Sequence, residues 1–309
     1  MNALVLKTTG KNYTVRTVEG IIVECGLKGI FRNKGIKSTN PIVVGDNVEI
    51  AQESDRWMIV KLIERKNFIV RRSVNLSKQS HILASNIDQA ILMITLDRPI
   101  TTTAFIDRFL VAANASNIEV ILLFNKIDLY DSKLLENKKE LEEVYRLAGY
   151  KTISISVLND NLLSIKNIMK DKLNLIAGHS GVGKSTLINN LQSNLRLATK
   201  VVSESHNQGQ HTTTFSQLYE LDFGGSIIDT PGIKGFGLVD VQISDIASLF
   251  PEFIAIRNSC KYYNCIHKNE PECAVKLAVE HGSISKSRYA NYLSMITEDD
   301  GNTYRKEKY

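Results

Sequence analysis

The chain has no apolar run long enough to cross a bilayer, and its first residues lack the pattern of a secretion signal. The longest apolar runs, such as residues 90–94 and 120–124, are far below the roughly 18 residues that a membrane span needs. The opening sequence MNALVLKTTG has neither the basic region nor the long apolar region of a signal peptide. We therefore exclude a membrane-spanning protein and expect a cytoplasmic one.

Cysteine and proline are scarce. The 5 prolines form no Pro-rich linker, and the sequence contains no internal repeat and no low-complexity tract. Of the 4 cysteines, Cys25 stands alone, whereas Cys260, Cys265 and Cys273 crowd together around His267. This spacing favours a metal site over disulfides. With 309 residues and a hydrophobic fraction of 43%, the chain is long and apolar enough for two or three globular domains.

Positive charge is concentrated near the amino terminus. The whole chain has a net charge of +5, but residues 1–72 alone hold 13 Lys and Arg against 7 Asp and Glu. Such a segment can attract a polyanion. Charge alone is equally consistent with the solvated faces of a small basic barrel.

The pattern of apolar and polar residues changes twice along the chain, which predicts three domains. Residues 1–72 show short alternating runs punctuated by glycine, which predict a small antiparallel β-barrel of the OB-fold type. Residues 73–237 alternate apolar strands with helical stretches, which is typical of a doubly wound α/β domain with a mostly parallel sheet. Residues 238–309 lack apolar strand runs and read as a mostly helical, zinc-binding domain with a polar tail.

The stretch GHSGVGKST matches the phosphate-binding pattern G-x-x-x-x-G-K-[ST] and follows an apolar strand. Its glycines let backbone N–H groups turn toward phosphate oxygens, and the helix that follows points its positive end at the same anion. Lys184 would reach the outer phosphates, and Ser185 would ligate Mg²⁺. The predicted nucleotide-binding residues here are Gly178, His179, Ser180, Gly181, Val182, Gly183, Lys184, Ser185 and Thr186.

A second motif, NKID, indicates which base is bound. Asp128, after a strand, can accept hydrogen bonds from both N1–H and the exocyclic amine of guanine, a pair of donors that adenine lacks. Asn125 can bond the base and brace the phosphate loop, and the stem of Lys126 can lie over the ring. The pair Ser156 and Val157, after the strand KTISI, is predicted to offer a backbone N–H to guanine O6. Both motifs follow strands, where open parallel sheets bind ligands.

Two further stretches resemble switch loops. In DTPG, Asp229 can hold Mg²⁺ through water and the Gly232 amide can sense the terminal phosphate. In GQHTTTF, Thr213, or its neighbours Thr212 and Thr214, can complete the Mg²⁺ shell; ordinary β-propensity also accounts for a threonine run before a strand.

The spacing Cys260-x4-Cys265-x-His267-x5-Cys273 supplies three thiolates and an imidazole. This set fills a tetrahedral zinc shell with no open position, so the expected ion is structural rather than catalytic. Metal binding can supply folding energy where apolar strands are few.

The base motif precedes the phosphate loop, the reverse of the usual order. Because the termini of a doubly wound domain lie close together, its chain can be cut in one loop and rejoined elsewhere. The pattern resembles the circularly permuted GTPases, and VVGDNVEI, the permuted motifs and CKYYNCIHKNEPECAV are most similar to the RsgA family. The resemblance implies an OB-fold, a GTPase core, a zinc domain and action on the small ribosomal subunit late in its maturation. That family often has Ser-Ala where this chain has Ser156-Val157.

The resemblance predicts a GTPase that uses GTP, magnesium and one zinc ion. Because Ile233 cannot orient water, His211 is the candidate catalytic residue alongside Lys184 and Thr213. We expect slow turnover alone and stimulation by the subunit, with tight binding in the GTP form and release after hydrolysis. The expected partners are the small subunit and its rRNA, with no membrane and no DNA, and the expected form is a monomer.

The predicted RNA contacts are the basic barrel and a carboxyl-terminal helix that carries Lys276, Lys286 and Arg288. For each of these residues, a solvent-facing side chain without an RNA contact is at least as good an interpretation. Two other functions stay open. A GTP-sensing RNA-binding module would keep the same pocket without useful turnover. An ATPase that handles DNA would keep the phosphate loop, although Asp128 argues against adenine.

Overall fold

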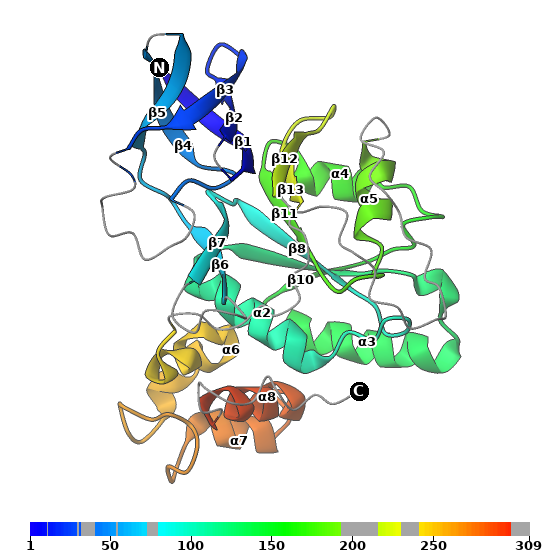
Figure 1. The fold of residues 1–309 in the computed structure, drawn as a ribbon. Coiled ribbons are helices and arrows are strands. Elements are labelled where there is room, and N and C mark those ends of the chain that lie inside the picture. Colours follow the sequence, from blue (N-terminus) through cyan, green and yellow to red (C-terminus); the bar gives the residue numbers. More distant parts are fainter. Residues whose placement is uncertain are drawn as a thin grey trace.

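The computed structural model describes residues 1–10, 12–29, 31, 41–53, 55–72, 80–192, 216–229 and 241–297. Within these ranges the chain forms a barrel, a central α/β unit and a helical carboxyl-terminal unit. In Figure 1 the barrel lies at the upper left, the carboxyl-terminal unit at the lower left, and the central unit between them and to the right. None of the described helices is long and apolar enough to span a membrane.

The barrel is built from five strands and closes on itself. The order of neighbours is β1-β2-β3-β5-β4, and β4 also pairs with β1. The β3–β5 pair is parallel, whereas the other pairs are antiparallel. Alternate side chains such as Val5, Val15 and Ile59 point into one apolar cluster, as period-2 patterning requires. The expected OB-like barrel is confirmed, with strands β1 (Asn2–Thr9), β2 (Asn12–Thr17), β3 (Ile22–Leu27), β4 (Asn47–Glu53) and β5 (Arg56–Leu62).

A short hairpin, β6 (Phe68–Arg72) and β7 (Ser80–Ser85), leads from the barrel to the central unit. The junction is locked by Asp46, whose side chain is fully buried. Its carboxylate accepts from Arg65 Nε at 2.6 Å, Arg65 Nη2 at 2.7 Å and Ser85 Oγ at 2.6 Å. At Gly45 a Cβ would lie 2.2 Å from the Ser85 carbonyl oxygen. The barrel therefore meets the hairpin through a contact that tolerates no side chain.

The central sheet has the order β10-β9-β8-β11-β13-β12. All its pairs are parallel except β12–β13. A bridge between Lys7 of β1 and Gln217 of β12 joins this sheet to the barrel. The strands are β8 (Gln89–Ile94), β9 (Glu119–Phe124), β10 (Lys151–Ser154), β11 (Leu173–Ala177), β12 (Gln217–Glu220) and β13 (Ser226–Asp229).

Helices cover both faces of the central sheet. One core cluster joins the sheet to α2 (Thr103–Ala115) and to α3 (Ser132–Leu147), and a second joins it to α4 (Leu163–Met169) and α5 (Lys184–Leu191). Burial on both faces explains why β8 is buried along its whole length. The doubly wound fold expected from the sequence is confirmed.

The carboxyl-terminal unit is helical and packs beneath α2 (Figure 1). Its apolar cluster includes Phe250, Phe253 and Tyr292 together with Val111 from α2. This unit therefore shares its core with the central unit. Its elements are η3 (Ile243–Leu249), α6 (Pro251–Ile254), η4 (Arg257–Ser259), α7 (Ala274–Glu280) and α8 (Lys286–Thr297).

Candidate nucleotide and metal sites

The phosphate loop connects β11 to α5, in the middle of the central sheet. Gly178, Gly181 and Gly183 all have positive φ, at 141°, 88° and 106°. A Cβ at Gly178 would lie 2.6 Å from the Met93 carbonyl oxygen, and one at Gly183 would lie 2.5 Å from Asn125 Nδ2. Side chains are therefore excluded at both ends of the loop, by β8 and by the base motif respectively.

Lys184 folds back over this loop. Its Nζ donates to the carbonyl oxygens of Gly178 and His179, each at 2.7 Å. The ammonium is thus held at the loop that would receive phosphate oxygens. Ser185 and Thr186 follow in the first turn of α5, half-buried, while Ser180 is exposed at the turn of the loop.

Asn125 ties three predicted elements together. It directly follows β9 and is 3% exposed. Its Nδ2 donates to the carbonyl oxygen of Val182 in the phosphate loop at 2.8 Å, and its Oδ1 accepts from the Val157 N–H in the base loop at 3.0 Å. Because β8, β9 and β11 are parallel neighbours, their carboxyl ends meet at one edge of the sheet. One side chain therefore connects the two loops that the sequence assigns to phosphate and base.

Lys126 and Asp128 lie on the turn after Asn125. Lys126 adopts a left-handed conformation with φ of 63°, and its Nζ donates to the Arg98 carbonyl oxygen at 2.6 Å. Burial lowers the pKa of this amine, against the raising effect of nearby carboxylates. Asp128 is exposed, and one of its oxygens accepts from Asn159 Nδ2 at 3.2 Å. An exposed carboxylate at this position can meet a ligand from solvent.

The base loop is more heavily engaged than the sequence suggested. The Ser156 N–H donates to Asp160 at 2.6 Å, the Val157 N–H donates to Asn125, and Asn190 of α5 donates to the Val157 carbonyl oxygen at 2.8 Å. Both N–H groups proposed for guanine O6 thus have protein partners in this structure.

Sequence reasoning missed Tyr130, which is buried at 8% exposure. The only signal in the sequence is a tyrosine two positions after NKID, whose hydroxyl needs a partner if the ring is buried. Its hydroxyl accepts from the Leu96 N–H at 2.8 Å and donates to the Asn125 carbonyl oxygen at 2.9 Å. It therefore fixes the base motif against the loop that follows β8.

Of the predicted switch residues, the structure describes only Asp229. The backbone of Asp229 ends β13 and is paired with Ile176 of β11, so the strand points to the same edge of the sheet as the phosphate loop. The remaining predicted switch residues, His211, Thr212, Thr213, Thr214, Gly232 and Ile233, lie outside the described residues.

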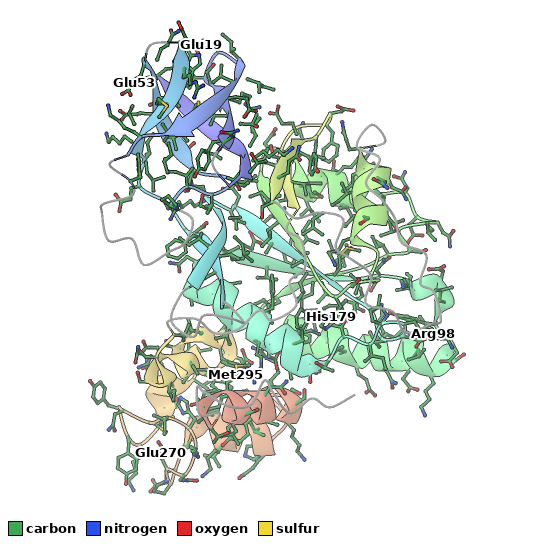
Figure 2. All side chains as sticks on the ribbon, in the orientation of Figure 1. Glu19, Glu53, Arg98, His179, Glu270 and Met295 are labelled. Carbon is green, nitrogen blue, oxygen red and sulfur yellow. The ribbon has the colours of Figure 1, made fainter. Side chains whose placement is uncertain are left out.

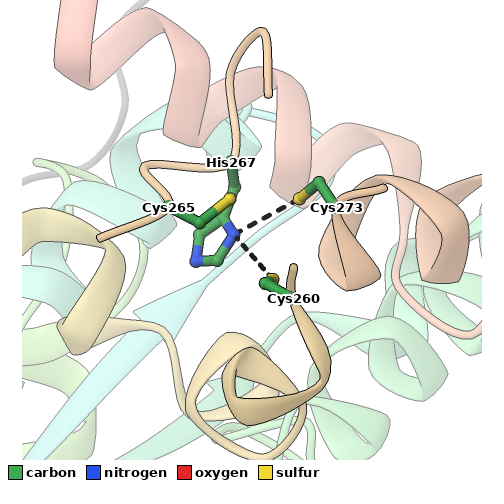
Figure 3. Close-up of side chains that lie close together, drawn as sticks. All are labelled: Cys260, Cys265, His267 and Cys273. Atoms are coloured by element: carbon green, nitrogen blue, oxygen red, sulfur yellow. Dashed lines mark hydrogen bonds between the residues drawn. The ribbon is translucent and has the colours of Figure 1, made fainter. Parts of the chain in front are cut away.

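The four predicted metal ligands come together (Figure 3). The ligand atoms of Cys260, Cys265, His267 and Cys273 all lie within 4.8 Å of one another. His267 Nδ1 lies 3.6 Å from Cys260 Sγ and 3.4 Å from Cys273 Sγ. A tetrahedral zinc ion with ordinary bond lengths places such N and S atoms about 3.5 Å apart. The residues present therefore fit zinc through the Nδ1 atom of His267.

Groups around this cluster hold its loop in place. His267 has φ of 58°, and Tyr289 donates to its carbonyl oxygen at 2.7 Å. The Glu270 carboxylate accepts from the backbone N–H groups of residues 266, 268 and 269. Burial, together with the neighbouring Cys273 thiol, raises the pKa of the Cys265 thiol to about 12. Since zinc binds thiolate, the ion itself must displace this proton.

One of the predicted RNA contacts is wrong. Arg288 is 1% exposed because it lies between Asp107 and Glu252, so it is not available to phosphate. Lys276 donates to the Glu270 carbonyl oxygen at 3.2 Å, whereas Lys286 is exposed. The apolar and aromatic surroundings of Arg288 come from distant segments, which a local charge pattern does not reveal.

Comparison with known proteins gives consistent matches along the chain. The model of the RsgA GTPase matches residues 62–239, and that of the RsgA N-terminal domain matches residues 3–58. The chain is 52% identical over 314 residues to the small ribosomal subunit biogenesis GTPase RsgA of Flavobacterium psychrophilum, covering 100% of this chain and 96% of that one. Identity to the protein of the same name from Bacteroides fragilis is 49%, with 99% of each chain covered.

Solved structures agree. YjeQ from Thermotoga maritima superposes with a TM-score of 0.79 at 35% identity, covering 98% of this chain and 99% of that one. YloQ, described as a circularly permuted GTPase, superposes with a TM-score of 0.75 at 30% identity, covering 100% of this chain and 96% of its own. The permuted order of motifs and the three-part fold are thus shared over nearly the full length.

Proposed function

The chain belongs to the RsgA GTPase family, and from this premise we propose that it hydrolyses GTP to GDP and phosphate during late maturation of the small ribosomal subunit. The observation that carries the proposal is the bridge made by Asn125, which bonds the phosphate loop at Val182 and the base loop at Val157. A side chain that ties a phosphate cradle to a base reader suits a guanine nucleotide site, and Asp128 supplies the guanine-specific carboxylate.

The nucleotide would lie along the carboxyl edge of the central sheet. Residues 178–186 would surround the phosphates, with the Lys184 ammonium moving from its carbonyl partners to the outer phosphate oxygens. Asn125, Lys126, Asp128 and the loop at Ser156 and Val157 would hold the base. Ser185 and Thr213 would hold Mg²⁺, with Asp229 reaching it through water, and the ion would neutralise charge on the phosphates. Gly232 would offer its amide to the terminal phosphate.

Hydrolysis in this class depends on positioning and charge stabilisation more than on covalent chemistry by the protein. We assign Lys184 to the developing charge on the transferred phosphoryl group and Thr213 to the closing of the site. His211 is the proposed group that orients the attacking water, because Ile233 cannot do so. This arrangement predicts slow turnover by the free protein and faster turnover when the bound subunit positions His211.

The zinc ion is proposed to be structural, one per chain. Cys260, Cys265, His267 and Cys273 fill its shell and leave no position open for a substrate. We propose that the amino-terminal barrel and exposed lysines such as Lys286 contact rRNA phosphates, that binding is tight with GTP and weak with GDP, and that the protein works as a cytoplasmic monomer without DNA. The proposed domain limits are residues 1–72, 73–237 and 238–309.

The experiment that tests this function is GTP hydrolysis by the zinc-loaded protein, alone and with purified small ribosomal subunits, with ATP as the control nucleotide. A slow basal rate that rises many-fold with subunits and is absent with ATP supports the assignment. If the hydrolysis rate is the same with and without subunits, the proposed action on the small ribosomal subunit is wrong. If the protein binds GTP and subunits but its turnover is not stimulated, a GTP-sensing module is favoured. If His211→Ala keeps full stimulation, the proposed role of His211 is wrong.

A further inference from the structure

Helix α2 contacts three different parts of the protein through three sets of side chains. Its sheet-facing residues, among them Ile106, Phe109 and Leu110, are buried in the main core. Its first turn carries Phe105, whose ring lies against the imidazole of His179 in the phosphate loop, with 4.0 Å between ring centroids and 32° between planes. His179 is labelled in Figure 2, where it lies next to this helix. The helix thus begins at the nucleotide site.

The third set faces the carboxyl-terminal unit. Asp107, Val111 and Asn114 are spaced by four and three residues, so they share one face of the helix. Val111 enters the apolar cluster of the carboxyl-terminal unit, and Asn114 Nδ2 donates to the Leu249 carbonyl oxygen at 2.8 Å. Asp107 accepts from Arg288 Nη1 at 2.6 Å. This face is therefore an interface with the zinc-bearing unit.

The ion pair at this interface is tightly constrained. Asp107 is 0% exposed and Arg288 is 1% exposed. Arg288 also donates to both oxygens of Glu252, at 2.8 and 3.0 Å, while Asn291 donates to the second oxygen of Asp107 at 2.6 Å. A buried pair with its hydrogen bonds satisfied on both sides has one favoured geometry, because moving either group leaves a buried charge without its partner.

The same helix α8 that carries Arg288 also holds the metal loop. Tyr289 donates to the His267 carbonyl oxygen at 2.7 Å, and Tyr292 donates to the Ile266 carbonyl oxygen. A continuous set of contacts therefore runs from the phosphate loop through Phe105, α2, Asp107 and Arg288 to the zinc ligands. It is separate from the covalent path that leaves β13 through residues 230–240.

From these contacts we propose that Phe105 and Asp107 are positioning residues: α2 couples the conformation of the phosphate loop to the seating of the zinc-bearing unit. The proposal rests on the nucleotide site described above. It adds a set of contacts through which that site and the zinc-bearing unit influence each other. Because coupling between two sites is reciprocal, a change at the Asp107–Arg288 pair must alter nucleotide affinity, and the bound nucleotide must alter the stability of the zinc unit. Either effect is lost when the contact between Phe105 and His179 is lost.

The test measures the affinities of fluorescent GDP and of a fluorescent non-hydrolysable GTP analogue for the full-length, zinc-loaded protein. Asp107→Asn keeps the shape of the side chain and removes its charge; Asn291→Ala removes one hydrogen bond and is the milder variant. We expect each to change the ratio of the two affinities, by about fivefold for Asp107→Asn. In a Phe105→Leu background the same changes should have no effect, and Phe105→Tyr, which keeps the ring, should restore it.

The matched control is Thr297→Val, which removes hydrogen bonds to the carbonyl oxygens of Leu293 and Ser294 at the end of α8 and contacts neither α2 nor the metal loop through them. A second readout is the rate at which a chelator removes zinc with GDP or with the GTP analogue bound, which should differ in wild type and become equal in Phe105→Leu. The coupling is refuted if Asn291→Ala and Asp107→Asn leave the affinity ratio unchanged or shift it no more than Thr297→Val does. It is also refuted if they shift the ratio equally in the Phe105→Leu background. Failure of the wild-type protein to bind either nucleotide would instead overturn the nucleotide site itself, and the coupling with it.

Discussion

Asn125 is the side chain whose removal should damage nucleotide binding most without touching a predicted phosphate ligand. It is 3% exposed, and it satisfies the carbonyl oxygen of Val182 and the N–H of Val157, both of which belong to buried residues. Asn125→Ala leaves two buried polar groups without a partner. At about 1–3 kcal/mol for each of the two groups, the loss is on the order of 2–6 kcal/mol. If the loss falls on the bound state, affinity drops by roughly 30- to 20,000-fold.

Asn125→Asp separates the two contacts. The carboxylate still accepts from the Val157 N–H, but it places a second acceptor against the Val182 carbonyl oxygen, so only the link to the phosphate loop is broken. We expect weaker binding of GDP for this variant, with the base loop still in place. The control is Asn190→Ala, which removes the contact from α5 to the Val157 carbonyl oxygen and leaves the phosphate loop untouched.

The assay is titration of fluorescent GDP at fixed Mg²⁺, with thermal unfolding measured on the same samples without nucleotide. A fall in affinity that exceeds the fall shown by Asn190→Ala, at an unfolding temperature near that of wild type, supports the bridge. If Asn125→Asp and Asn125→Ala both bind GDP as wild type does, the bridge contributes nothing to the site and the reasoning that joins the two loops is refuted.

Three other outcomes are expected. Asp128→Asn, which replaces an acceptor by a donor, should lower affinity for guanine and raise it for xanthine nucleotides, as competition binding would show; unchanged preference would exclude Asp128 from base recognition. Because burial raises the pKa of the Cys265 thiol to about 12, zinc binding should release protons and weaken as pH falls, measured by competition with a chelator at pH 6 and pH 8; pH-independent affinity would contradict it. Asp46→Asn should destabilise the protein by about 3–5 kcal/mol in denaturant unfolding, because it removes the charge of a fully buried carboxylate and leaves the partly buried Arg65 guanidinium without its charged partner. The exposed pair changed by Glu49→Gln should have little effect.

The features predictable from the sequence are those whose geometry is set within a short stretch. Two positions of the phosphate loop, Gly178 and Gly183, have positive φ and a neighbour too close for a side chain. Only glycine suits such positions, so the glycine spacing predicts the loop before its contacts are known. The metal ligands occupy a 14-residue segment whose spacing alone permits a closed shell. The alternation of strands and helices likewise fixes the central fold class.

Features that depend on distant residues were not predictable. Arg288 reads as a surface cation in its own helix, and it is buried because Asp107, 181 positions away, lies opposite it. The engagement of Ser156 by Asp160 could have been suspected, since an acidic side chain four residues on can reach back to a free N–H. The hydrogen bond from Asn190 to the Val157 carbonyl oxygen depends on how α5 packs, so the local sequence does not predict it.

The permuted order of the motifs changes how the site is connected but not how it is built. Asn125 and Val182 are 57 positions apart, with the base motif first, yet they meet because β9 and β11 flank β8 in one parallel sheet. What the permutation alters is the segment that follows β13, which here leads to η3 and the zinc-bearing unit. That unit then packs back on α2, whose first turn touches the phosphate loop. The nucleotide site is therefore connected to the zinc unit twice, along the chain and through the contacts of α2. A variant that disrupts only one of these connections shows which of them transmits the effect of the bound nucleotide to the zinc unit.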